Sequence, residues 1–260
     1  MNHDIVIAGA GPAGSALAIL LARRGLKVLL LEKSRFPRQK LCGEFLSPEC
    51  WWSFERLGLS ELIARTGGTE IRGACIVSPA GELVLADFPP LSAGERGGLG
   101  LSRFRLDHML LEAAKAAGAE VIEGSKVTRV VRQAGAIRGV EGVVRGSGTP
   151  QVFLAKIIVA ADGRHSVIAR ELQALPPRRP AKRVLVAFGA HFTQVQGSDD
   201  RVELFLYPGG YGGLVRIEEG MTNLCFITEA SVVRRCRGDV NRLLEQTMLQ
   251  NRVSAGAHRA

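Results

Sequence analysis

The chain has 260 residues, more than one compact domain usually needs; 46% of them are hydrophobic and only 5% are aromatic. Lysine and arginine (34) outnumber aspartate and glutamate (25), which gives a formal net charge of +9. This composition excludes a disordered chain and a coiled coil, and it indicates one large or two interleaved α/β domains with many glycine turns.

The positive charge is spread along the chain. Its densest clusters, 178–183 and 234–237, contain no aromatic residue and match no nucleic-acid-binding module. Because short runs of charge usually lie on solvated surface, we expect no nucleic-acid partner. A negatively charged cofactor or substrate accounts for part of the excess.

The five cysteines are odd in number and include no CxxC pair. The sequence therefore predicts neither a disulfide framework nor a metal site, and it favours a reducing compartment, the cytoplasm. No apolar run reaches membrane-spanning length, because Arg23 and Arg24 interrupt the best candidate. Glu32 stands where a signal peptide would need small residues for cleavage.

The first forty residues predict a strand, a helix and a second strand. Residues 5–8 are an apolar run that ends in glycines, 15–24 are apolar at most positions, and 27–32 are again apolar up to the final glutamate. Continuous apolar strands on both sides of a helix are typical of a parallel sheet that is covered on both faces.

The later elements predict a β-meander, a return to the first sheet and then a second, antiparallel region. Helices are expected at 49–57, 60–65, 107–117 and 240–250. Strands are expected at 71–77, 82–88, 120–122, 126–133, 137–145, 152–161, 184–192 and 202–207, with a hairpin formed by the first two.

A GxGxxG pattern of Gly9, Gly11 and Gly14 lies between the first strand and helix. Gly9 permits the tight turn, Gly11 lets the backbone approach a pyrophosphate, and Gly14 allows close helix–sheet packing. Glu32 ends the next strand at the spacing expected for an acid that binds ribose hydroxyls. FAD or NAD is therefore favoured over NADP. The alternatives are a glycine-rich turn of another α/β protein and a solvated strand-end acid.

Four segments together resemble the superfamily of flavoprotein monooxygenases and geranylgeranyl-reductase-like enzymes. They are GAGPAG with Glu32 and Lys33, the KLCGE loop at 40–44, Arg103 before Leu106-Asp107, and ADGRHS at 161–166. The resemblance extends from the N-terminus to about residue 170. It implies bound FAD and leaves NAD(P)H open as the electron donor.

The resemblance also implies a set of cofactor-binding residues. They are Gly9, Gly11, Pro12, Ala13, Gly14, Glu32, Lys33, Cys42, Gly43, Arg103, Val127, Asp162 and Gly163. Within this set, Arg103 is implied to reach the FAD phosphates, Val127 to back the adenine, and Asp162 with Gly163 to contact the pyrophosphate and ribityl region. An ordinary surface arginine and a simple strand-end turn are the alternatives for Arg103 and for the Asp-Gly pair.

Cys42 and Glu44 are the candidate catalytic residues, because in the reductase-like branch a CGG or CGE loop lies beside the isoalloxazine and the substrate. A lone cysteine next to glycine is more often a small packing residue, and nothing in the sequence indicates a lowered pKa for Cys42. Glu44 either orients a substrate or is a solvated loop acid.

The segment 207–213, YPGGYGG, is similar to the PGGYGW segment of this superfamily. Residues 214–216 are Leu-Val-Arg, where the reductases usually have Trp and a Phe-Pro pair, so isoprenoid reduction is disfavoured. Flavin halogenation is also disfavoured, since no Trp-x-Trp-x-Ile-Pro run is present. A glycine-rich hairpin turn is the alternative for this segment.

Together these features predict an α/β fold: a Rossmann-like FAD-binding domain with a parallel sheet and a β-meander (1–72 and 101–175), interleaved with a partial antiparallel substrate domain (73–100 and 176–260). The third, Gly-Asp-Ala-like fingerprint of the superfamily is not found, so a truncated chain or a shortened fold is expected. The leading hypothesis is an FAD-dependent oxidoreductase, of monooxygenase or reductase type, that acts on a small hydrophobic organic substrate. A catalytically silent FAD- or nucleotide-binding fragment and an NAD-dependent dehydrogenase are the alternatives. The oligomeric state is left open.

Overall fold

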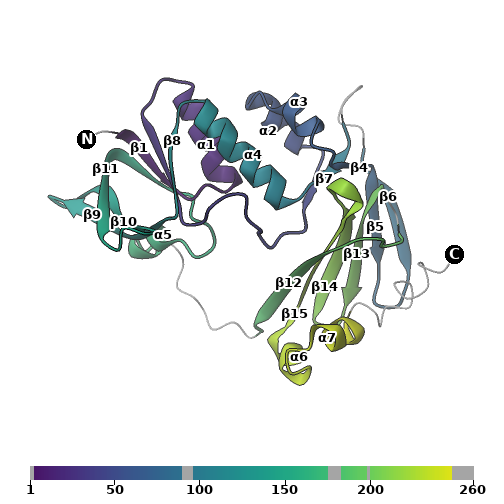
Figure 1. Cartoon of the computed structure of the whole chain (residues 1–260). Helices are drawn as coiled ribbons and strands as arrows, with labels where there is room; N and C mark the ends of the chain where they lie inside the picture. Colours follow the sequence, from purple (N-terminus) through teal and green to yellow (C-terminus); the bar gives the residue numbers. More distant parts are fainter. Residues whose placement is uncertain (1–2, 90–95, 175–182, 198–199, 248–260) are drawn as a thin grey trace. The chain divides into compact units, whose positions relative to one another are not determined.

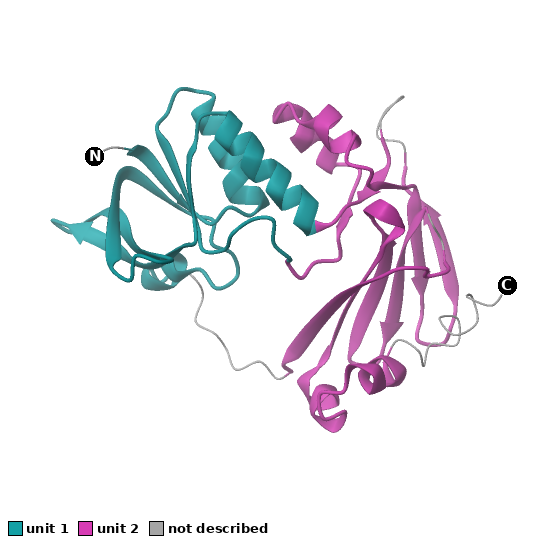
Figure 2. Cartoon of the chain, viewed as in Figure 1, with its two compact units in different colours: residues 1–39, 103–178 teal, residues 40–102, 179–260 magenta. Residues whose placement is uncertain are grey.

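The computed structural model describes residues 3–89, 96–174, 183–197 and 200–247. The chain forms two compact units (Figure 2): residues 1–39 with 103–178 are the first unit, and residues 40–102 with 179–260 are the second. Residues 40–72, which the sequence analysis placed in the FAD-binding domain, thus lie in the second compact unit. The functional domain bounds stay a prediction.

The first unit is built on a six-stranded sheet in the order β8-β2-β1-β11-β10-β9 (Figure 1). Its strands are β1 (His3–Ala8), β2 (Val28–Glu32), β8 (Glu120–Glu123), β9 (Ser125–Gln133), β10 (Ala136–Val144) and β11 (Pro150–Ala160). Its helices are α1 (Pro12–Ala22), α4 (Arg103–Ala116) and α5 (Val167–Glu171). Strands β8, β2, β1 and β11 run parallel, while β9, β10 and the start of β11 are antiparallel. The predicted meander and its return to the main sheet are confirmed.

Apolar composition explains the core of the first unit. All five residues of β2 are buried, and α1 packs against β1, β2 and α4. Helix α1 begins at Pro12, earlier than predicted, because proline is well suited to the first position of a helix, where no N–H is needed.

The second unit contains a six-stranded sheet in the order β12-β15-β14-β13-β5-β6 and a small sheet in the order β3-β7-β4. Its strands are β3 (Phe45–Leu46), β4 (Thr69–Ile71), β5 (Gly73–Val77), β6 (Leu83–Asp87), β7 (Gly98–Gly100), β12 (Leu185–Phe192), β13 (Arg201–Tyr207), β14 (Gly210–Arg216) and β15 (Thr222–Glu229). Its helices are α2 (Cys50–Arg56), α3 (Ser60–Ala64), α6 (Ala230–Arg235), α7 (Val240–Gln246) and the 3₁₀ turn η1 (Glu218–Gly220). The predicted β5–β6 hairpin is confirmed.

The observed elements of this unit differ from the expected ones in several places. The strand predicted at 71–77 is interrupted at Arg72, because its first part pairs with β7 and its second part with β6 and β13. Strands β3, β7, β14 and β15 and helix α6 were not predicted; in β14 the glycines hide the alternation. The end of the helix predicted at 240–250 lies outside the described residues.

Strand register places side chains in rows on the two faces of the large sheet. We call one face the His191 face. Its rows are His191, Asn223 and Val215; then Gly189, Cys225, Gly213 and Leu204; then Ala187, Ile227, Tyr211 and Leu206. The opposite face carries Phe205, Leu224 and Phe226, which form a core with Cys236 and Leu243.

Candidate functional site

Three of the predicted binding segments follow neighbouring strands of the first unit. Ala8 of β1 pairs with Leu31 of β2 on one side and with Ala160 of β11 on the other. The glycine loop, Glu32 and the segment 161–166 directly follow these three residues. They therefore share the carboxyl edge of the parallel strands, where open α/β sheets bind their ligands.

The glycines of the first loop differ in their surroundings. A Cβ atom on Gly9, whose φ is +99°, would lie 2.4 Å from the Ala161 carbonyl oxygen, and one on Gly14 would lie 1.8 Å from the Gly9 carbonyl oxygen. A Cβ atom on Gly11 would meet no atom within 4 Å. Gly9 and Gly14 are thus required by packing, whereas Gly11 faces open space.

Helix α1 begins within this glycine loop. Gly11 is the N-cap residue and provides no side-chain cap, Pro12 follows it, and no acidic residue lies in the first turn. The backbone N–H groups of Ala13 and Gly14 belong to the first turn of the helix, whose N–H groups have no partner within the helix. They and the helix dipole suit the binding of a phosphate.

Glu32 is buried, with 4% of its surface exposed. Its carboxylate accepts hydrogen bonds from the backbone N–H groups of Ala10 (2.8 Å) and Ser34 (2.9 Å). A solvated strand-end acid is therefore excluded. Each carboxylate oxygen has more than one acceptor site, so a ribose hydroxyl can also be bound. The neighbouring Lys33 is exposed.

Arg103 forms a bidentate ion pair with Asp107: Nε lies 2.6 Å from Oδ1 and Nη2 lies 2.8 Å from Oδ2. Arg38 Nη1 lies 3.0 Å from the same carboxylate, whose side chain is fully buried. The Arg103 side chain is only 16% exposed, so it is not an ordinary surface arginine. Two guanidinium groups around one carboxylate leave a net positive charge, which favours an anionic ligand.

Asp162 has one satisfied and one unsatisfied carboxylate oxygen. Oδ2 accepts a hydrogen bond from the Val167 N–H (2.8 Å) at the start of α5. Oδ1 is buried and has no hydrogen-bond partner within the described structure. Gly163 follows with φ of +81° and no atom within 4 Å of a Cβ position. A buried acceptor beside open space fits a ligand with hydroxyl donors, such as the sugar hydroxyls of FAD.

Val127 is buried in the apolar core of the first unit, together with Val6, Leu29 and Leu31. Packing explains its side chain, so its implied place behind the adenine stays a proposal.

Cys42, Gly43 and Glu44 lie in the second unit. Asn223 Nδ2 donates a hydrogen bond to the Cys42 carbonyl oxygen (3.0 Å). Glu44 is 2% exposed, so a solvated loop acid is excluded. Its Oε2 lies 2.6 Å from His191 Nε2, and its carbonyl oxygen accepts the Leu101 N–H (3.0 Å).

Sequence reasoning missed His191. A lone histidine gives no motif, but it alternates in step with Gly189 and so shares a face of β12 with it. That alternation was the signal in the sequence that could have identified His191.

The Cys42 thiol is partly buried. Burial raises the pKa of the nearby Cys225 thiol, and Cys42 and Glu44 add to this shift.

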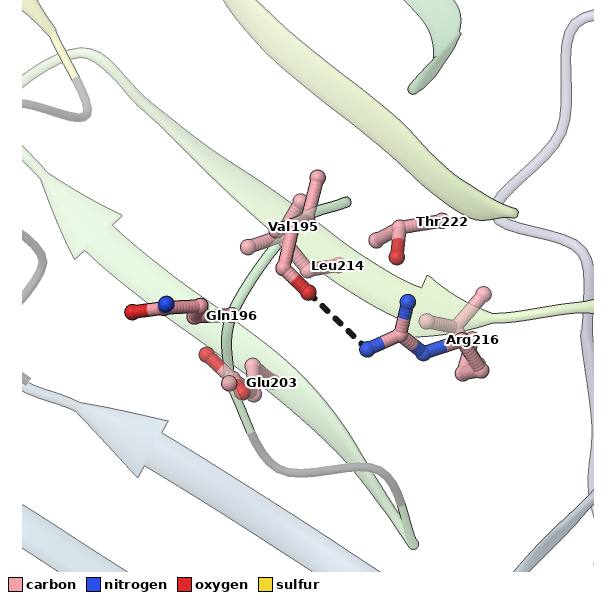
Figure 3. Close-up of a pocket in the computed structure, with 8 residues that line it drawn as sticks. Val195, Gln196, Glu203, Leu214, Arg216 and Thr222 are labelled. Atoms are coloured by element: carbon pink, nitrogen blue, oxygen red, sulfur yellow. Dashed lines mark hydrogen bonds between the residues drawn. The ribbon is translucent and has the colours of Figure 1, made fainter. Parts of the chain in front are cut away.

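The second unit also contains a small pocket (Figure 3). It is lined by Val195, Gln196, Gly197, Glu203, Leu214, Val215, Arg216 and Thr222. Arg216 donates a hydrogen bond to the Val195 carbonyl oxygen (2.9 Å), drawn as a dashed line in Figure 3. Arg216 and Thr222 are paired across β14 and β15 and alternate with Val215 and Asn223, so they belong to the face opposite His191.

Among the described residues, no group of His, Cys, Asp or Glu side chains is arranged to hold a metal ion. Within the same ranges, no helix is long and apolar enough to cross a membrane.

A family model described as FAD binding domain matches residues 2–234. Menaquinone reductase of Mycobacterium tuberculosis is 35% identical over 171 residues, which cover 66% of this chain and 40% of that protein. Digeranylgeranylglycerophospholipid reductase 2 of Methanopyrus kandleri is 32% identical over 232 residues, covering 86% of this chain and 54% of that protein. The chain therefore spans about half the length of these curated relatives, or less.

Solved structures give the same fold. A geranylgeranyl bacteriochlorophyll reductase-like protein from Thermoplasma acidophilum superposes with a TM-score of 0.76 at 26% identity, covering 93% of this chain and 60% of that one. The myxobacterial chondrochloren halogenase, an FAD-dependent enzyme, gives a TM-score of 0.80 at 22% identity, with 95% of this chain and 58% of that one covered. At that identity the halogenase supports the fold alone.

Proposed function

Because this chain belongs to the family of FAD-binding domains, we propose that it acts in a flavin-dependent oxidoreductase of the monooxygenase or reductase type. When bound, FAD supplies the redox chemistry, and the protein supplies binding, orientation and electrostatics. NAD(P)H is proposed as the source of electrons.

The arrangement at Gly11 carries this proposal. It is the one member of the GxGxxG pattern whose Cβ position is free of atoms, and it stands at the uncapped N-terminus of α1. We assign the pyrophosphate to this position. Glu32 then holds the ribose hydroxyls, Arg103 contributes positive charge towards the phosphates, and Asp162 Oδ1 accepts a hydrogen bond from a cofactor hydroxyl.

A hydrophobic organic substrate is proposed for the second unit. On the His191 face, Leu185, Leu206 and Tyr211 are 53%, 39% and 48% exposed. Leu41, 50% exposed, contacts this face at Gly189, where a Cβ atom would lie 2.7 Å from the Leu41 Cδ1 atom. Exposed apolar side chains gathered on one sheet face support an apolar ligand.

The loop at Cys42 and Gly43 is proposed to border the isoalloxazine, as the sequence resemblance implies. Cys42 is held through its carbonyl oxygen by Asn223, and a Cβ atom on Gly43 would meet no atom within 4 Å. A loop that is fixed on one side and open on the other suits the close approach of a planar ring. Glu44 is proposed as a positioning residue.

Spectroscopy of the purified full chain tests this function. We expect visible flavin absorbance, or a change in flavin fluorescence when FAD is titrated, followed by reduction of the bound FAD by NADH or NADPH without oxygen. Binding without reduction would indicate a binding module that is silent by itself. Tight NAD binding without flavin would indicate a dehydrogenase. Absence of both flavin signals overturns the proposal.

A further inference from the structure

We propose that His191 is the acid–base residue of the second unit, oriented by Glu44, and that it exchanges a proton with a phenol-type oxygen of a ligand whose apolar body lies on the His191 face. The inference rests on the proposed function insofar as this ligand is the enzyme's substrate. The geometry of the site comes from the second unit alone.

Glu44 fixes the imidazole. Its carboxylate is 2% exposed and meets Nε2 of His191 at 2.6 Å. The Glu44 backbone is in the left-handed region, with φ of +57°, which is uncommon for a residue other than glycine. Such backbone conformations persist where the surroundings enforce them, and they cluster at functional sites. Here the Leu101 N–H binds the Glu44 carbonyl oxygen and Asn223 holds the neighbouring Cys42.

The pairing determines which nitrogen is available. A carboxylate at Nε2 accepts a hydrogen bond from that nitrogen, so the neutral imidazole carries its proton on Nε2. Nδ1 is then the acceptor nitrogen, since the ring contacts Glu44 through Nε2. The side chain is 23% exposed, so a ligand can reach it.

The surface next to His191 is apolar. In the adjacent row, Gly189 and Gly213 flank Cys225, and the side chains of Leu41 and Leu204 lie against these two glycines. The following row contains Ile227, Tyr211 and Leu206. Rows on one face are two residues apart, about 7 Å along a strand, so an apolar group that packs against Leu41 at Gly189 lies about one row from the imidazole.

Besides Glu44, the ionisable groups of the described residues next to His191 are the thiols of Cys225 and Cys42, and Tyr211 lies two rows away on the same face. Cys225 projects from β15 and Cys42 comes from the loop, and burial raises the pKa of the Cys225 thiol, which stays neutral at neutral pH. Glu44 is the charged group in contact with the imidazole. One buried carboxylate thus orients the imidazole, the arrangement found for histidine bases in acid–base catalysis.

The proton step is balanced within the pair. The ligand O–H bond breaks, an N–H bond forms at Nδ1, and the ligand becomes a phenolate beside an imidazolium that is paired with Glu44. Return of the proton from Nδ1 to the ligand, or to water, restores the neutral imidazole. No electrons are exchanged in this step.

A chromogenic phenol tests the proposal on the FAD-loaded full chain. para-Nitrophenol is the probe and para-nitroanisole is the matched ether that has no proton to give. We expect the bound phenol to ionise at a pH about one unit lower in the wild-type protein than in His191→Gln, because the imidazolium stabilises the phenolate. Binding of the ether should change by less than about twofold. His3→Gln, which removes a surface His–Glu pair with a 2.8 Å contact, is the control and should behave as wild type.

Equal ionisation in wild type and His191→Gln overturns the proposal, as does an equal loss of both probes or the absence of probe binding to wild type. Nitrogen NMR of the histidine rings, assigned by comparison with His191→Gln, is a second measurement. It should find the neutral His191 ring protonated on Nε2, and a proton on Nδ1 contradicts the proposal. Both measurements can be repeated without FAD, so failure to bind FAD refutes the proposed function separately.

Discussion

Gly14 lies so close to Gly9 that a methyl group on Gly14 would come within 1.8 Å of the Gly9 carbonyl oxygen. Gly14, in the first turn of α1, thus packs directly on the turn that follows β1. This contact fixes the helix N-terminus over the carboxyl edge of the sheet, where the proposed cofactor phosphates bind.

Gly14→Ala should damage the fold as well as the site. Overpacking against backbone atoms forces the helix away from the turn, at a cost of about 3 kcal/mol in the free energy of unfolding. Denaturant unfolding of the FAD-free protein measures this loss. Unchanged stability would show that the helix and turn are less closely packed than described.

Glu32→Gln should weaken both stability and FAD binding. An amide oxygen accepts one of the two backbone N–H groups that the carboxylate accepts, and the other is left facing an amide donor. We expect the free energy of unfolding to fall by about 2 kcal/mol. Comparison of unfolding with and without FAD separates the fold from the ribose contact.

Arg103→Lys keeps the charge but removes the bidentate pair with Asp107. Because Arg38 still contacts Asp107, we expect a stability loss of about 2 kcal/mol, less than for a buried carboxylate left alone. FAD affinity should fall about tenfold. Arg132→Gln, an exposed residue of β9, is the control for general charge and should leave affinity nearly unchanged.

Asp162→Asn should weaken FAD binding without lowering the stability of the FAD-free protein. The amide oxygen of asparagine can still accept a hydrogen bond from the Val167 N–H. The substitution removes the negative charge that the carboxylate shares with its buried, unpartnered Oδ1 atom. The FAD-free protein should be equally stable or more stable by about 1 kcal/mol. FAD affinity should nevertheless fall, as calorimetric titration would show; a destabilised protein with normal affinity would contradict this role.

Glu123 should make the free energy of unfolding depend on pH in the acidic range. Burial raises the pKa of Glu123, but the Phe36 N–H and Lys115 outweigh burial and hold it below the ordinary value of 4.5. Because the pKa is lower in the folded state, the stabilisation is complete above the unfolded pKa and is lost as the pH falls through the folded pKa. Below about pH 4.5, the unfolding free energy of Glu123→Gln should decline less steeply than that of wild type.

The first unit could largely be predicted from sequence because its signals are local. The glycine loop, Glu32 and the Asp162-Gly163 pair each follow an apolar strand, and strand order brings them together. The partner of Arg103 was not foreseen. Asp107 was expected to begin a helix, whereas its carboxylate is buried under two arginines, and burial of a charge cannot be read from helical spacing.

The second unit was less predictable because its contacts join distant parts of the chain. Glu44 and His191 are 147 residues apart in sequence, and no motif links them. Of the glycines that hid β14 from periodicity, Gly213 belongs to the His191 face and Gly212 to the opposite face. Local patterns therefore identified the cofactor loop and missed the residues that face a substrate.

FAD titration of wild type and Gly11→Ala tests the central claim most directly. Gly11 has ordinary backbone angles (φ −68°, ψ −178°) and no atom within 4 Å of its Cβ position, so alanine should leave the FAD-free stability unchanged. The methyl group would occupy the space assigned to the pyrophosphate. We predict FAD binding by wild type and binding at least about tenfold weaker in Gly11→Ala. Equal affinity in the two proteins, or no binding by wild type, would contradict the account.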